Sequence, residues 1–148
     1  MTESDLILDR VEFTLDSGKI GEFVRATLTA DPVHTDDDAA ATAGFAGRAA
    51  TPTHVVVAGH YRDQQAMVAG LGLDLARVVV GSVRWSYARP LVAGDHLVGT
   101  RRVVADERRD GRLGGSMRLV TLETEYVDAS AKPVVWTREV IIERGAAT

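Results

Sequence analysis

The feature that most constrains the fold is a two-residue periodicity that begins near Val78 and continues to Glu143. Apolar and polar residues alternate over residues 78–87, 96–105, 117–127 and 133–143. A period of two is typical of strands that bury one face of a sheet. We therefore predict four antiparallel strands joined by hairpins in this half of the chain.

The first half of the chain has a different pattern. A short strand is predicted over residues 9–16, followed by helices over residues 17–28 and 37–43. A third helix is expected to run without a break from Thr53 to about Ala69. Three consecutive valines near its start favour a strand by propensity, but burial can override that preference.

The order of a strand, then helices, then four strands is typical of an α+β fold. A length of 148 residues suits one domain with a substantial core. We expect a single domain over residues 1–148, with its core between about residues 9 and 144. In this domain the antiparallel sheet wraps around the central helix.

Composition excludes several classes of function. The net charge of −4 gives no electrostatic support for a nucleic-acid partner. The chain has no cysteine, which excludes disulfides, thiolate nucleophiles and cysteine metal sites. It has no apolar run of membrane-spanning length, and its acidic start, Met1 to Asp5, lacks a signal-peptide pattern. We expect a cytoplasmic protein without a membrane partner.

The stretch from Thr29 to Asp36 contains the strongest candidate for catalysis, His34. Pro32 fixes its own φ and disfavours a helical conformation at Asp31, so the chain bends there. A histidine on a rigid bend suits a general acid or base. One alternative is a structural turn in which the histidine fills a gap. The other, a metal site with the following aspartates, is disfavoured because acidic first turns of helices are common.

Three stretches resemble one known family. They are Asp31-Pro32-Val33-His34-Thr35-Asp36, continued to Phe45; Ala50-Thr51-Pro52-Thr53; and the segment from Asp74 to Asp95 with its Arg-Pro…Ala-Gly-Asp turn. In this order they resemble the MaoC-like dehydratases and (R)-specific enoyl hydratases, which have the hot-dog fold. The resemblance is closest to the N-terminal-type domain of FAS1-like dehydratases and to small actinobacterial dehydratase subunits.

The resemblance implies a reaction on thioesters. Water is removed from a (3R)-hydroxyacyl chain, or added to an enoyl chain, carried by acyl carrier protein or coenzyme A. No cofactor beyond the carrier's phosphopantetheine is implied. His34 falls on the catalytic histidine, with Asp31 and Thr29 as candidates for handling the hydroxyl. Backbone N–H groups around Thr53 and His54 would polarise the thioester carbonyl.

The sequence departs from the family pattern at several positions. Thr29 stands where active members have an acid, Pro52 has no N–H to donate, and Val80 replaces a frequent histidine. One branch of the family works as heterodimers, in which one subunit supplies catalysis and the other supplies much of the acyl channel. This chain could be an active enzyme that forms a homodimer, or the second kind of subunit in a heterodimer. Both assemblies therefore stay open for this chain, and a thioesterase is a weaker third reading based on the shared fold alone.

Arginines crowd one predicted hairpin, and Arg108 and Arg109 are the two we single out. The simplest interpretation is a solvated charged loop. The functional alternative is docking of an acidic carrier protein or of coenzyme A phosphates, because the arginine fork matches phosphate and carboxylate geometry.

Overall fold

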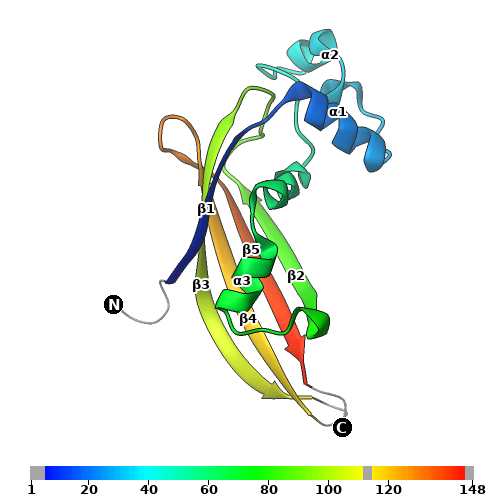
Figure 1. Ribbon diagram of the computed structural model, residues 1–148. Coiled ribbons are helices and arrows are strands. Elements are labelled where there is room, and N and C mark those ends of the chain that lie inside the picture. Colours follow the sequence, from blue (N-terminus) through cyan, green and yellow to red (C-terminus); the bar gives the residue numbers. More distant parts are fainter. Residues whose placement is uncertain (1–5, 112–114, 146–148) are drawn as a thin grey trace.

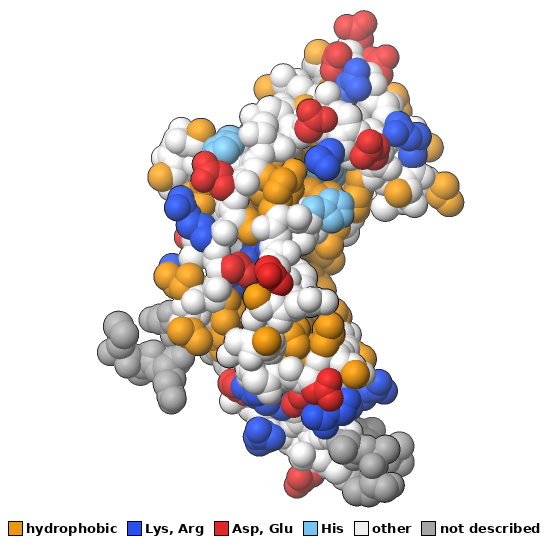
Figure 2. Space-filling model, in the orientation of Figure 1, with side chains coloured by type: hydrophobic (Ala, Val, Ile, Leu, Met, Phe, Trp, Pro, Cys, Tyr) orange, Lys and Arg blue, Asp and Glu red, His pale blue; other side chains and the backbone are white. Residues whose placement is uncertain are grey.

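The computed structural model describes residues 6–111 and 115–145 (Figure 1 and Figure 2). Its centre is one antiparallel sheet with strand order β1-β3-β4-β5-β2. The strands are β1 (Leu6–Thr14), β2 (Val78–Tyr87), β3 (His96–Asp110), β4 (Ser116–Val127) and β5 (Pro133–Arg144). The expected α+β class with an antiparallel sheet is confirmed.

Helices cover one face of the sheet and one of its ends (Figure 1). α1 (Ser17–Ala26) and α2 (Asp37–Thr42) gather at one end, with the 3₁₀ turn η2 (Pro32–His34) between them in the chain. The 3₁₀ helix η3 (His54–Tyr61) and helix α3 (Gln64–Gly70) run along the concave face, and η4 (Leu75–Arg77) leads into β2. We refer to the two ends of the sheet as the helical end and the far end.

The prediction of one unbroken helix from Thr53 to Ala69 is wrong. The segment is 3₁₀ up to Tyr61, Arg62 is extended (φ −112°, ψ 144°), and α3 then starts afresh. Asp63 caps α3, since its carboxylate accepts a hydrogen bond from the Ala66 N–H at 2.8 Å. The valines weaken helix propensity before the break, and Arg62 turns away to pair with Asp9.

The sheet also differs from the predicted meander. β2 pairs with β5 and not with β3, whose other neighbour is β1. The segment after β2 therefore crosses the helical end of the sheet instead of forming a hairpin. β3 continues to Asp110, so the first half of the charged loop predicted over residues 106–115 is strand, and residues 112–114 lie outside the described ranges.

The buried apolar side chains form two clusters beneath the helices. The helical-end cluster includes Ile20, Val55, Leu97, Tyr126 and Val135. The far-end cluster comprises Val68, Leu71, Leu73, Val103, Val120, Leu122 and Ile141. Each fully buried aliphatic side chain contributes about 1.5–3 kcal/mol to the free energy of unfolding.

Candidate active site

His34 lies in the 3₁₀ turn η2 at the helical end, and its ring is half-buried. Its Nδ1 atom is 2.6 Å from the carbonyl oxygen of Ala49. A carbonyl can only accept a hydrogen bond, so Nδ1 carries the proton. The other ring nitrogen, Nε2, is then unprotonated in the neutral ring and available as a base.

The turn that carries His34 is held by Asp31. The Asp31 carboxylate accepts a hydrogen bond from the Val33 N–H at 3.1 Å, and Pro32 occupies the first position of the turn. Proline suits that position because the missing N–H would have no partner there. Asp31 is exposed, and its visible role in the chain is to fix the turn.

Three segments clamp this site together through their backbones. The Ala49 N–H donates to the Val33 carbonyl (3.0 Å), the Ala50 N–H to Leu91 (2.8 Å), and the Ala93 N–H to Arg48 (2.8 Å). The His34 turn is thereby tied to residues 48–50, and these to residues 91–93.

The Arg-Pro…Ala-Gly-Asp turn supports the outer layer of this clamp. Both oxygens of Asp95 accept hydrogen bonds from Arg89, at 2.8 and 2.9 Å, and one also accepts from the Val92 N–H at 2.8 Å. Two-pronged arginine–carboxylate pairs are strong and geometrically specific. This turn therefore positions His34 indirectly, through residues 48–50.

Thr29 has a half-buried hydroxyl in a short chain of hydrogen bonds. The Thr27 hydroxyl lies 2.8 Å from the Phe23 carbonyl and 3.0 Å from the Thr29 hydroxyl. Because Thr27 donates its one proton to that carbonyl, Thr29 donates to Thr27. Thr29 keeps free lone pairs that can accept a hydrogen bond from water.

The start of η3 places Thr53 and His54 in different environments. Thr53 is exposed, whereas His54 is 1% exposed and packs edge-on against Phe23, with ring centroids 5.2 Å apart. Burial, with a smaller contribution from Lys19, lowers the pKa of His54 to about 4. His54 is therefore a neutral core residue. Its backbone N–H donates a hydrogen bond to the Thr51 carbonyl at 3.0 Å.

Comparison with known proteins places this chain in a family. Residues 6–137 match the family described as FAS1-like, dehydratase domain region. The chain belongs to this FAS1-like dehydratase family. A UPF0336 protein of Clavibacter michiganensis is 38% identical over 128 residues, which cover 86% of this chain and 83% of that protein.

Two solved structures have the same fold. The HadBC (3R-hydroxyacyl-ACP dehydratase) complex of Mycobacterium tuberculosis has a TM-score of 0.76 at 21% identity, covering 96% of this chain and 98% of that one. A MaoC-like dehydratase has a TM-score of 0.82 at 21% identity, covering 97% of this chain and 42% of that one. The assignment to the MaoC-like hot-dog fold is confirmed.

In this FAS1-like dehydratase chain, Arg108 and Arg109 lie far from His34. They are near the far end of β3, whereas the segments clamped to His34 lead into the start of that strand. Arg109 lies thirteen positions after His96 along this strand, a distance of about 40 Å. Arg109 pairs with Glu107 at 2.7 Å, and within one chain neither arginine shares a site with His34.

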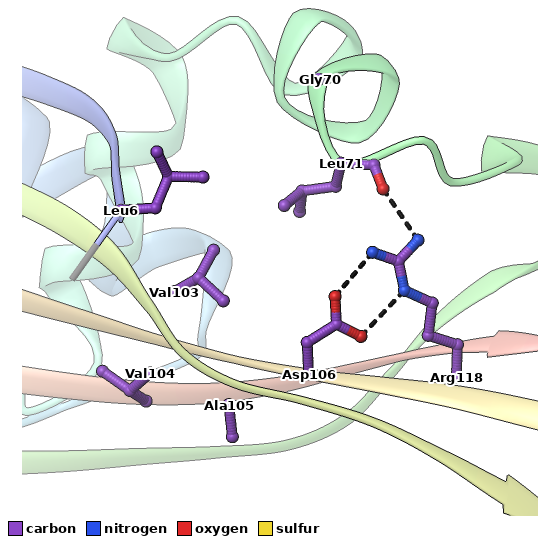
Figure 3. A pocket seen from close by; sticks show the side chains of 8 residues that line it. All are labelled: Leu6, Gly70, Leu71, Val103, Val104, Ala105, Asp106 and Arg118. Atoms are coloured by element: carbon purple, nitrogen blue, oxygen red, sulfur yellow. Dashed lines mark hydrogen bonds and ion pairs between the residues drawn. The ribbon is translucent and has the colours of Figure 1, made fainter. Parts of the chain in front are cut away.

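A cavity of about 580 Å³ also lies at the far end, between α3 and β3 (Figure 3). Its ionisable side chains, Asp106 and Arg118, bind each other at 2.9 and 2.6 Å, and Arg118 also donates to the Leu71 carbonyl at 2.8 Å. The hydrogen bonds from Arg118 lower the pKa of Asp106. This pair fastens the end of α3 to the sheet.

One buried group of charges was missed by the sequence interpretation. Asp9 of β1 accepts hydrogen bonds from Arg62 and from Arg101 of β3. The available signal was position: Asp9 shares the inward face of its strand with Val11 and Phe13. Charged residues at inward positions of a strand need partners, because an unpaired buried charge is costly.

Within residues 6–111 and 115–145, no group of three histidine, aspartate or glutamate side chains could hold a metal ion. No helix in those ranges is long and apolar enough to cross a membrane.

Proposed function

We propose that this chain is a hydro-lyase that removes water from (3R)-hydroxyacyl thioesters or adds it to the enoyl forms. The observation that carries the proposal is the His34 ring, which the Ala49 carbonyl fixes with Nε2 available as a base, in a chain of the FAS1-like dehydratase family. The acyl chain is carried by coenzyme A or by acyl carrier protein.

The chemistry needs a base at C2 and a proton for the departing oxygen at C3. In the proposed dehydration, Nε2 of His34 takes the C2 proton and the electrons of that bond form the C2=C3 double bond. The C3–O bond breaks, and the oxygen leaves as water with the proton returned by the imidazolium. Thr29 orients that water by accepting a hydrogen bond, a role that its free lone pairs allow.

Hydration of enoyl thioesters of several chain lengths tests the proposal. We expect the absorbance of the enoyl thioester to fall when purified protein is added. The hydration rate of His34→Ala should be lower by about 100-fold or more. His60→Ala is the matched control, because His60 is exposed on η3 and is expected to keep the rate. Activity that survives in His34→Ala would refute the role of His34.

A second candidate function is a subunit that shapes the acyl channel of a heterodimer. It is favoured by Thr29, which supplies no acid, and by Pro52, which supplies no N–H at the start of η3. An outer strand also leaves room for a partner, since Val80 of β2 is 66% exposed. The HadBC dehydratase of similar fold is a complex.

Mixing this chain with a partner subunit distinguishes the two candidate functions. The heterodimer candidate predicts no hydration by the chain alone and activity after addition of a related hot-dog subunit with both a histidine and an acid. The homodimer candidate predicts that the purified chain is fully active without a partner. Light scattering should then show that the chain is a dimer.

A further inference from the structure

The start of η3 has one backbone N–H group that a substrate can reach. The His54 N–H is already used, since it donates to the Thr51 carbonyl at 3.0 Å, and Pro52 has no N–H. The Thr53 N–H donates to no residue that the structure describes. Thr53 is exposed, so this donor is accessible from outside the chain.

The loop that contains Thr53 also holds His34. The Ala49 carbonyl, which accepts from His34 Nδ1, lies four residues before Thr53, so the two α-carbons are at most about 14 Å apart. Between them, the Ala50 N–H is fixed to the Leu91 carbonyl at 2.8 Å. One anchored loop therefore positions the ring of His34 and presents the Thr53 N–H.

Tyr87 of β2 holds the end of this loop. Its hydroxyl donates a hydrogen bond to the Pro52 carbonyl. The side chain is half-buried, lies opposite Val135 and packs against the helical-end cluster. Burial, with a smaller contribution from Tyr126, raises the pKa of Tyr87 to about 12, so the hydroxyl keeps its proton and stays a donor at neutral pH.

The hydrogen bond to Pro52 controls the direction of the Thr53 N–H, because both groups belong to one peptide unit. This unit is planar and trans, so its C=O and N–H point in opposite directions. A hydroxyl that fixes the Pro52 carbonyl therefore also fixes the Thr53 N–H. Donation to the carbonyl polarises the peptide as well, which makes its N–H a stronger donor.

We propose that Tyr87 is a positioning residue, whose hydroxyl aims and strengthens the Thr53 N–H as the donor to the thioester carbonyl. The inference rests on the proposed function, in which removal of the C2 proton builds negative charge on that carbonyl oxygen. A donor fixed in advance stabilises such charge without having to reorient during the reaction. Tyr87 acts through the peptide between Pro52 and Thr53 and needs no contact with the substrate.

The first test is the kinetics of Tyr87→Phe, which removes the hydroxyl and keeps the packed ring. A donor aimed at developing charge acts mainly in the transition state, so kcat for hydration of enoyl-coenzyme A should fall about tenfold while KM changes less than about twofold. Tyr61→Phe is the matched control, because Tyr61 is 45% exposed and stacks on Phe13. It should keep both constants.

The second test measures the donor itself and needs no turnover. The probe is a saturated coenzyme A thioester with ¹³C at the carbonyl, of the chain length that binds most tightly, and the readout is the infrared stretching band of that carbonyl. For the bound probe, the band should lie below its position in buffer in the wild type and in Tyr61→Phe. It should move back toward that position in Tyr87→Phe, whereas a tyrosine that only stabilises the fold would leave the band unchanged.

The outcomes separate this inference from the proposed function. If Tyr87→Phe keeps the wild-type kcat or the wild-type band, the inference is overturned, while hydration by the wild type still supports the function. A wild-type band at the position found in buffer overturns the inference even if Tyr87→Phe does not fold. Failure of every thioester to bind or to be hydrated, alone and with a partner subunit, overturns both.

Discussion

Two regions of the molecule, the helical end and a transverse row of residues paired across the sheet, hold polar groups in opposite ways. The transverse row consists of Asp9, Arg101, Thr124, Thr137 and Trp85. At the helical end, His34 is positioned by backbone carbonyls and amides, and the ring stays half-buried. In the transverse row, charged side chains hold one another beneath a helix, away from solvent. The first arrangement leaves one ring nitrogen free for chemistry, whereas the second engages its charged groups with one another.

This difference predicts that substitutions in the two regions affect different properties, stability in one and activity in the other. Changes in the transverse row should cost stability, because they strand a buried charge. Changes to the hydrogen bonds around His34 should cost activity and little stability, because one net hydrogen bond contributes only about 1 kcal/mol.

The largest effect is expected for Arg101→Met, which keeps the length of the side chain but leaves Asp9 with one partner fewer. We expect the free energy of unfolding to fall by about 3 kcal/mol in urea denaturation, the range for breaking a buried pair. Arg138→Ala is the control, because its pair with Glu123 is exposed and worth at most about 1 kcal/mol. Equal effects of the two changes would contradict the comparison.

The next effect concerns pH and His54 at the helical end. Folding lowers its pKa from 6.5 to about 4, so between these values the unfolded chain binds a proton that the folded chain does not. Stability is therefore lost as the pH falls from 6.5 to about 4, by up to about 3 kcal/mol.

The variant His54→Phe, which has no titrating group, should lose this part of the pH dependence, as measured by urea denaturation at several pH values. A pH dependence that is unchanged in His54→Phe would show that other groups cause the acid sensitivity.

A smaller effect is expected for Asp95→Ala, which removes the support of the clamp around His34. The loss of the Arg89 pair and of the Val92 bond should lower the free energy of unfolding by about 1–2 kcal/mol. Looser positioning should lower kcat for enoyl hydration by about tenfold. Asp37→Ala, which breaks an exposed pair at the same end, should leave kcat unchanged.

The smallest effect is expected for Arg108→Ala with Arg109→Ala, since both side chains are exposed. The free energy of unfolding should change by less than about 0.5 kcal/mol. If these arginines dock an acidic carrier, KM for the acyl carrier protein substrate rises severalfold and becomes less sensitive to salt. Unchanged kinetics on both carriers would remove the docking role.

The same contrast explains how much could be predicted from the sequence. The ranges of β2, β4 and β5 follow from alternation within each strand, which is a local property. The site of His34 followed from the Asp-Pro-Val-His segment and its family resemblance. The chemistry of the ring did not, because its tautomer depends on Ala49, fifteen residues later.

The transverse row could not be predicted because its partners are far apart in the chain. Asp9 and Arg101 are separated by 92 residues, and Asp9 and Arg62 by 53. Without these partners, the break after Tyr61 had no visible reason, and a helix through Arg62 agreed with local propensity. The pairing of β2 with β5 depends in the same way on long-range register.

The separation between β1 and β3 has a consequence for how the chain folds. β1 is made early during synthesis, yet among the described strands its one partner is β3, whose residues are made about ninety positions later. Contacts of such long sequence separation form slowly, because the loop between them must close first. We expect β1 to join the sheet late. The ion pairs of Asp9 with Arg62 and Arg101 would then form in the last slow step of folding.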